Sequence, residues 1–219
     1  MYIISPSILS CDFSKLGVQV EETGKTKAEY IHIDVMDGMF VPNITIGPCV
    51  VASLRSHSKL VFDTHLMINE PIRYVEEFRK AGADIITVHA EACTDIEETL
   101  KAIKKTGAQA GLSIKPKTDP EVIRPFLPLC DMILIMTVEP GFGGQSFIYE
   151  AVENIKKVKE MITEASLSIP IEVDGGITTE TIGIAAKAGA EIFVAGSAVY
   201  KKPDIAKAVS DLLDACENV

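Results

Sequence analysis

The segment YIHIDVMDG, residues 30–38, carries the pattern that best indicates the fold of this chain. Its apolar run up to Met36 ends at an Asp-Gly pair, which is typical of a short buried strand followed by a turn. Because side chains alternate along a strand, His32, Asp34 and Met36 share one face. A histidine and a carboxylate two positions apart, at the end of a buried strand, predict half of a metal site or of an acid–base pair.

Similar apolar runs alternate with amphipathic stretches along the whole chain. Strands are expected to begin near Tyr2, Tyr30, Leu60, Asp84, Ala108, Asp131, Ser168 and Glu191. Helices are expected over residues 14–24, 47–57, 71–81, 95–106, 119–128, 148–165, 180–188 and 203–217. The Ala-Gly-Ala segments at 81–83 and 188–190 predict helix C-caps that turn into the next strand.

Eight such units, with strands apolar on both faces, imply a parallel sheet covered by helices. Eight units in 219 residues favour a closed (β/α)₈ TIM barrel. An open doubly wound sheet is the alternative, because periodicity alone does not determine whether the sheet closes. We expect one domain over residues 1–219, since no low-complexity or charge-block segment suggests a linker.

Composition limits the partners of the protein. The net charge of -10 argues against a nucleic-acid or anionic-membrane surface, and an anionic substrate would have to be bound by dipoles and backbone amides. The five cysteines are odd in number and form no CxxC motif, so neither a disulfide framework nor a cysteine-rich zinc site is expected. Without a leader-like segment or an 18-residue apolar run, a cytoplasmic protein is expected.

In a barrel, chemistry belongs at the carboxyl ends of the strands, and the polar residues follow this rule. In chain order, the residues expected at that rim are Ser7, His32, Asp34, His65, His89, Glu91, Lys115, Met136, Thr137, Asp174, Gly196 and Ser197. So many polar and small residues on one rim predict a functional site there.

Two histidines and two aspartates of this rim can form a site for one divalent metal ion, such as Zn²⁺, Fe²⁺ (Fe(II)), Co²⁺ or Mn²⁺. They are His32, Asp34, His65 and Asp174. Alternatively, each histidine is only a hydrogen-bonded core residue, but two on neighbouring strands with Asp34 between them favour a metal. His57 is expected at a solvated helix end, and His89, without a partner at ligand spacing, in a supporting or structural place.

Three glycine-rich loops follow the last strands, at residues 139–145, 174–176 and 195–197. Glycines let the backbone approach a ligand and direct N–H groups at an anion. Barrels commonly hold phosphate in the loops after strands 7 and 8. Tight turns alone explain many glycines, but three adjacent loops favour a phosphate site.

Several long motifs resemble the ribulose-phosphate 3-epimerase family, from about residue 3 to 215. They are PSILS (6–10), HIDVMDG (32–38), FVPN (40–43), HLM (65–67), MTVEPGFGGQ (136–145) and EVDGG (172–176). The resemblance implies a (β/α)₈ barrel that interconverts D-ribulose 5-phosphate and D-xylulose 5-phosphate in the pentose phosphate pathway. It also implies homo-oligomers. Met39 departs from the family, which often has His there, and this leaves loop shape and lid contacts open.

The resemblance also assigns roles to residues. It makes His32, Asp34, His65 and Asp174 the ligands of one divalent metal, with Asp34 and Asp174 the acid–base pair. It gives Ser7 and His65 to the sugar. Substrate binding, mostly of the phosphate, falls to Gly141, Phe142, Gly143, Gly144, Gly175, Gly176, Gly196 and Ser197.

The chemistry is consistent with these residue types. Epimerisation at carbon 3 of a 2-ketose removes a proton next to a carbonyl and returns one to the opposite face, which two carboxylates can do. A metal bridging two substrate oxygens would stabilise the enediolate charge. Met36, Met67 and Met136 at the same rim are expected to form an apolar wall, although methionine more often fills gaps in a core.

Three rival functions remain at this point. An epimerase of the same fold acting on a ketohexose 6-phosphate such as allulose 6-phosphate would have a similar site. A decarboxylase or aldolase of related barrels would need an Asp-x-Lys-x-x-Asp array, and Met36 stands where that array needs Lys. A barrel that only binds sugar phosphates is disfavoured by intact carboxylates at 34 and 174. Lys115 is expected to pair with Glu139 or another rim carboxylate.

Overall fold

The computed structural model describes residues 2–217, in which eight parallel strands form one sheet. The strands are β1 (Ile3–Pro6), β2 (Tyr30–Met36), β3 (Val61–Met67), β4 (Ile85–His89), β5 (Gln109–Ile114), β6 (Met132–Met136), β7 (Ile171–Asp174) and β8 (Ile192–Ala195). Neighbouring strands pair in the order β1-β8-β7-β6-β5-β4-β3-β2, and one parallel bridge between Ser7 and His32 joins the two edges. The sheet is therefore a nearly closed barrel. This confirms the predicted fold class and excludes the open doubly wound sheet.

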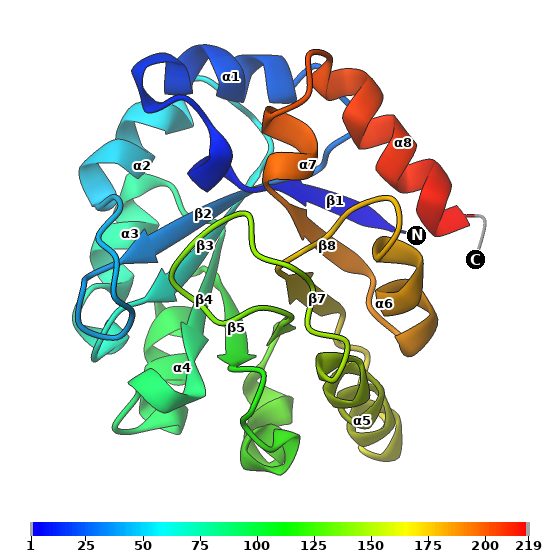
Figure 1. Ribbon diagram of the computed structural model, residues 1–219. Helices are drawn as coiled ribbons and strands as arrows, with labels where there is room; N and C mark the ends of the chain where they lie inside the picture. The colour runs from blue at the N-terminus through cyan, green and yellow to red at the C-terminus, as the bar shows by residue number, and fades with distance from the viewer. Residues whose placement is uncertain (1, 218–219) are drawn as a thin grey trace.

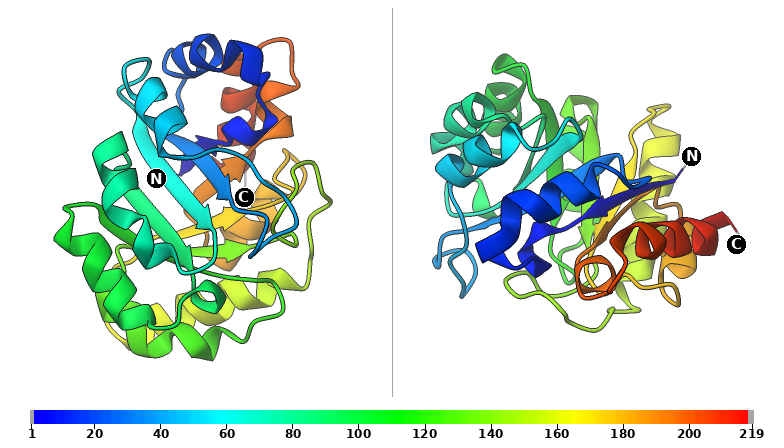
Figure 2. Two further views of the ribbon diagram at one scale, coloured as in Figure 1. Left: turned by 90° about the vertical axis from the view of Figure 1, so that its left-hand side faces the viewer. Right: turned by 90° about the horizontal axis from the view of Figure 1, so that it is seen from above.

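Helices surround the strands as a ring (Figures 1 and 2). The α-helices are α1 (Leu16–Thr23), α2 (Pro48–Arg55), α3 (Val75–Ala81), α4 (Ile96–Lys105), α5 (Ala151–Glu164), α6 (Ile182–Ala188), α7 (Ser197–Tyr200) and α8 (Ile205–Glu217). Short 3₁₀ helices are η1 (Ile8–Ser10), η2 (Phe13–Lys15), η3 (Pro71–Arg73), η4 (Ala90–Ala92) and η5 (Pro120–Leu129). The last helix, α8, packs against the first strand, β1, so the two ends of the described chain lie side by side in the barrel.

Local sequence signals explain where several helices begin and end. The carboxylate of Asp95 accepts a hydrogen bond from the Glu98 N–H (2.8 Å) and caps the start of α4. Gly82 and Gly189 are the C-caps of α3 and α6, as the two Ala-Gly-Ala segments predict.

One predicted helix differs in kind. The helix predicted over 119–128 is the 3₁₀ helix η5 (Pro120–Leu129) and not an α-helix. Pro125 and Pro128 lie inside this segment, and proline has no N–H to donate to the carbonyl four residues earlier. The segment therefore covers the barrel between β5 and β6 with a tighter, poorly bonded turn structure.

The barrel interior is apolar at one end and polar toward the other. Ile85, Met132 and Ile192 pack together inside the end where the strands begin. Nearer the carboxyl ends, the interior side chains include fully buried polar groups, namely Ser5, His32, Asp63, Thr87 and Glu172. The outward faces of the strands pack against the helices in the main core cluster. None of the helices in residues 2–217 is both long enough and apolar enough to cross a membrane.

Candidate active site

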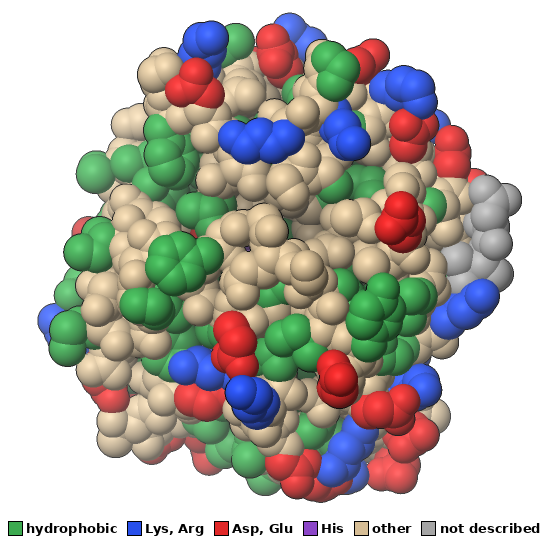
Figure 3. All heavy atoms as spheres, viewed as in Figure 1, with side chains coloured by type: hydrophobic (Ala, Val, Ile, Leu, Met, Phe, Trp, Pro, Cys, Tyr) green, Lys and Arg blue, Asp and Glu red, His purple; other side chains and the backbone are tan. Residues whose placement is uncertain are grey.

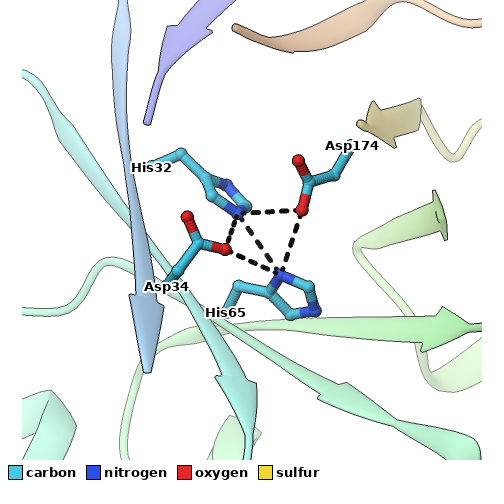
Figure 4. A group of neighbouring side chains, drawn as sticks. All are labelled: His32, Asp34, His65 and Asp174. Carbon is cyan, nitrogen blue, oxygen red and sulfur yellow. Dashed lines mark hydrogen bonds and ion pairs between the residues drawn. The ribbon is translucent and has the colours of Figure 1, made fainter. Parts of the chain in front are cut away.

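Four side chains from β2, β3 and β7 point toward one another (Figure 4). They are His32, Asp34, His65 and Asp174, the predicted metal-ligand set. His32 Nε2 lies 3.3 Å from His65 Nδ1, 3.4 Å from Asp34 Oδ1 and 3.8 Å from Asp174 Oδ2. His65 Nδ1 lies 3.5 Å from Asp34 Oδ1 and 3.6 Å from Asp174 Oδ2. Strands far apart in the sequence thus bring the four ligand atoms into one cluster.

These separations fit one metal ion. A tetrahedral site with bonds of about 2.1 Å places neighbouring ligand atoms about 3.4 Å apart. The five measured separations run from 3.3 to 3.8 Å. Two imidazoles and two carboxylates form a donor set for borderline divalent ions, and it does not select one of them. The structure therefore contains a cluster that can hold a divalent cation.

The electrostatics of the cluster also attract positive charge. Burial by itself lowers the pKa of His32, but the carboxylates of Asp63 and Asp34 outweigh burial and raise it well above its usual range. Burial also disfavours ionised Asp34, yet the charges and hydrogen bonds of His32 and His65 lower its pKa. His32 thus favours its protonated form and Asp34 its ionised form. A divalent ion bound here would displace the proton from His32.

Two acidic residues beside the cluster were not predicted from the sequence. Asp63 Oδ2 lies 2.5 Å from Nδ1 of His32, on the side of the ring that faces away from the other ligands. Glu172 Oε1 lies 3.8 Å from the same nitrogen. Asp63 and Glu172 are fully buried, and burial together with the charge of Asp63 raises the pKa of Glu172 well above its usual range.

His89 is not one of the four clustered residues but contacts one of them, which is consistent with the supporting place expected from the sequence. Its Nε2 lies 2.9 Å from Nε2 of His65, and its Nδ1 lies 3.3 Å from Glu91 Oε2. Burial lowers the pKa of His89 to about 4 even though Glu91 favours its charged form. His57 lies after the end of α2, where its exposed ring pairs with Glu21 at 2.6 Å, in agreement with the predicted helix-end position.

A cavity of about 520 Å³ opens above the cluster. Its lining includes Asp34, Asp174 and the remaining predicted substrate and wall residues, namely Ser7, Met36, Met67, Met136, Gly141, Phe142, Gly143, Gly144, Gly175, Gly176, Gly196 and Ser197. His32 and His65 are fully buried, and both contact the lining carboxylates of Asp34 and Asp174. The Ser7 hydroxyl donates a hydrogen bond to Asp34 Oδ2 (2.5 Å), which fixes that carboxylate at the cavity floor.

Three glycine-rich loops enclose one side of this cavity. The loop between β6 and α5 crosses in front of the strands in Figure 1. Gly176 allows the close approach of two of these loops, because a Cβ there would lie 2.4 Å from the Phe147 backbone nitrogen. Among the described residues, no Lys or Arg lines the cavity, and the centre of this face in Figure 3 is mostly backbone and uncharged polar side chains.

The prediction for Lys115 was wrong. Its ammonium lies 4.0 Å from the centre of the Phe40 ring, and Glu139 pairs instead with Lys117 at 3.4 Å. An ammonium can rest on an aromatic face because the ring carries negative charge there. Met39, at the departure from the family pattern, is 79% exposed and lies outside the cavity lining.

Residues 3–200 match the family model described as the ribulose-phosphate 3 epimerase family. The chain belongs to this family. It is 49% identical to the ribulose-phosphate 3-epimerase of Bacillus subtilis over 213 residues, which cover 97% of this chain and 98% of that protein. It is 48% identical to the enzyme of that name from Synechocystis, with 95% of this chain and 91% of that protein covered. These matches confirm the family predicted from the motifs.

Solved structures share the fold of the family at low sequence identity. KGPDC from Streptococcus mutans superposes with a TM-score of 0.73 at 15% identity and covers 100% of this chain and 99% of that one. Orotidine 5'-phosphate decarboxylase from Pyrococcus horikoshii gives a TM-score of 0.67 at 15% identity, with 100% of both chains covered. At such identities the likeness shows the barrel fold alone.

Proposed function

We propose that this protein interconverts D-ribulose 5-phosphate and D-xylulose 5-phosphate by moving protons at carbon 3. The observation that carries the proposal is the pair Asp34 and Asp174, which face one cavity from β2 and β7 within a cation-ligand cluster. The relatives at 48–49% identity bear the name of this reaction. We also infer that residues 1–219 are one catalytic domain, since all eight strands belong to one sheet.

The two carboxylates supply the acid and the base. Inverting carbon 3 requires that one group takes the proton from one face and another returns a proton to the other face. Asp34 is 5% exposed and Asp174 is 15% exposed, so both are partly shielded and still reach the cavity. The hydrogen bond from Ser7 leaves Asp34 Oδ1 facing the histidines.

His32, Asp34, His65 and Asp174 would hold one divalent ion, with Zn²⁺, Fe²⁺, Co²⁺ and Mn²⁺ the candidates. When bound, this ion would act as a Lewis acid and stabilise the negative charge that develops on the substrate oxygens. The chain itself contributes the buried, fixed position of the ligands, which excludes water from one side of the reacting carbon.

The far end of the substrate would be held by the glycine-rich loops. The phosphate of a sugar phosphate would meet backbone N–H groups near Gly143, Gly176 and Gly196 together with Ser197, because no basic side chain of the described residues lines the cavity. Met36, Met67 and Met136 would form an apolar wall beside the reacting carbon.

Substitution of the two carboxylates tests the proposal. Asp34→Asn and Asp174→Asn remove a proton carrier with little change in size, so each is expected to lower kcat by at least about 10²-fold. The assay is conversion of ribulose 5-phosphate by protein whose bound metal has been quantified. If either variant retains metal and turns over within about threefold of the wild type, far short of the loss expected of a missing acid or base, the two-carboxylate assignment is wrong.

A parallel assay with allulose 6-phosphate decides between the pentose and ketohexose substrates. Higher kcat/KM for the hexose phosphate would identify the alternative epimerase. Binding of ribulose 5-phosphate without turnover, in metal-loaded protein, would identify a non-catalytic sugar-phosphate-binding barrel.

A further inference from the structure

We propose that His89 and Glu91 are positioning residues, which hold His65 so that its Nδ1 faces the bound cation. The inference rests on the proposed function in one respect only, because it takes His65 as a cation ligand. His89 and Glu91 lie outside the ligand cluster, and their hydrogen bonds reach neither Asp34 nor Asp174.

The hydrogen-bonding pattern assigns a direction to this chain of contacts. A hydrogen bond between two ring nitrogens needs one donor and one acceptor. His89 Nδ1 faces the Glu91 carboxylate at 3.3 Å, so this nitrogen carries the hydrogen and the opposite one, Nε2, accepts. Nε2 of His65, 2.9 Å away, must then donate. A neutral His65 with its hydrogen on Nε2 has the lone pair on Nδ1, the atom that faces the cluster.

Glu91 is fixed from the other side. Its Oε1 accepts a hydrogen bond from the Lys115 N–H (2.8 Å) and one from the Thr118 hydroxyl. The contacts thus run from the loop after β5 through Glu91 and His89 to His65. Rotation of the His65 ring would break this chain of hydrogen bonds at a fully buried position, where an unpaired polar group is costly.

Phe40 shields this series of hydrogen bonds from solvent. Its ring centre lies 4.8 Å from that of His89. The Lys115 ammonium lies over the same Phe40 ring at 4.0 Å. His89 is consequently 0% exposed although it lies at the rim of the barrel. A buried imidazole that water cannot reach keeps its two hydrogen bonds to protein groups only.

The second histidine of the cluster shows the same arrangement with a different partner. Asp63 holds Nδ1 of His32, which leaves Nε2 of that ring to face the other ligands. The two histidines therefore present opposite nitrogens, and each has its outer nitrogen held by a separate group. Outer partners of this kind orient ligand histidines and fix their tautomers.

The test uses Co²⁺ as the probe, added to the full chain after treatment with a chelator. Affinity comes from titration, and the visible absorption of bound Co²⁺ reports the geometry of its ligands. His89→Leu removes the acceptor and is expected to weaken Co²⁺ binding by about 10–100-fold and to change the absorption spectrum. His89→Gln keeps an acceptor on a side chain of similar reach, and most of the affinity and the wild-type spectrum should return.

Controls separate this effect from loss of structure. His57→Leu removes an imidazole far from the cluster and should leave both readouts unchanged. Circular dichroism of the metal-free proteins checks folding. If His89→Leu does not fold, Glu91→Gln decides, since it removes one acceptor from the far end of the hydrogen-bond chain that leads to His65. Variants at 89 and 91 that match the wild type in affinity and spectrum would overturn the inference. Wild-type protein that binds no Co²⁺ would instead overturn the cation site of the proposed function, and the inference with it.

Discussion

At the scale of single residues, alternation along the strands determines most of the site. His32 and Asp34 share a face of β2 because they are two residues apart, and the sequence predicted their meeting with His65 and Asp174. The prediction of the catalytic and substrate roles of these residues stays a prediction, whereas their placement together is what the structure shows.

The same alternation places two further acidic side chains inside the barrel. Asp63 lies two residues before His65, and Glu172 lies two residues before Asp174, so both must point into the barrel. They were missed because acidic side chains are rarely buried without a partner. Asp63 is hydrogen-bonded to His32 and Glu172 lies 3.8 Å from the same ring, and no local sequence pattern reveals that His32 comes to lie there.

Glu91 should make stability depend on pH in acid. Burial raises its pKa, but hydrogen bonds from His89, Thr118 and the Lys115 N–H outweigh burial and lower it from 4.5 to about 2. A carboxyl group whose pKa is lower in the folded state stabilises the protein when the pH is above its pKa in the unfolded state. For Glu91 this contribution is at most about 3 kcal/mol, and it is lost as the pH falls from 4.5 toward 2.

The measurement compares the free energy of unfolding of wild type and Glu91→Gln, both with chelator, from neutral pH down to about pH 2. The wild type should be the more stable at neutral pH, and the difference should shrink steadily below pH 4.5. A difference that does not change with pH would show that the charge of Glu91 adds no stability.

At the scale of elements, regular strands and helices were predicted closely and irregular ones were not. The apolar run at Tyr30–Met36 is β2, and the amphipathic stretch at 95–106 is α4 (Ile96–Lys105). The error at 119–128 arose because an α-helix and a 3₁₀ helix can show similar hydrophobic spacing. Here Pro125 and Pro128 decide the hydrogen-bond pattern.

The pairing of β4 with β5 depends on a glycine. Gly111 is the register partner of Thr87, and a Cβ at Gly111 would lie 2.2 Å from the Thr87 hydroxyl oxygen. Gly111→Ala should therefore destabilise the protein by about 1–3 kcal/mol through overcrowding. Thr87→Ala removes that oxygen, so the double variant Gly111→Ala/Thr87→Ala should be less destabilised than the sum of the single variants. Denaturant unfolding of all four proteins checks this, and additive losses would refute the contact.

At the scale of the whole molecule, counting units predicted the barrel. Eight β-then-α units, with strands expected to be apolar on both faces, were visible in the sequence, and the family motifs agreed with them. The helix side of the strands is apolar as expected, whereas the barrel interior also holds buried polar side chains. Closure itself depends on the meeting of Ser7 with His32, which lies between distant segments and leaves no local signal. The loop contacts around Lys115 were mispredicted for the same reason, because Phe40 comes from another strand's loop.

Removing the metal should inactivate the protein and leave it folded. The four proposed ligands lie at one rim, whereas the main core cluster lies between the strands and the helices. A chelator should abolish epimerisation and leave the circular dichroism spectrum unchanged. Tm should fall only as far as the lost free energy of metal binding accounts for. Activity should return with Mn²⁺ or Co²⁺. Loss of secondary structure in step with activity would show that the metal is needed for folding.

The charge of the molecule predicts an unusual response to salt. The proposed substrate is a dianion, the protein has a net charge of -10, and no Lys or Arg of the described residues lines the cavity. Repulsion at long range should therefore oppose binding, and it weakens when salt rises from about 0.01 M to about 0.15 M, because the screening length falls from about 30 Å to about 8 Å. The value of kcat/KM for ribulose 5-phosphate should rise over this range of sodium chloride. Uncharged ribulose is the control, and its poor turnover should not respond. A fall of kcat/KM for the phosphate alone would mean that cationic side chains bind it, contrary to the proposed anion site.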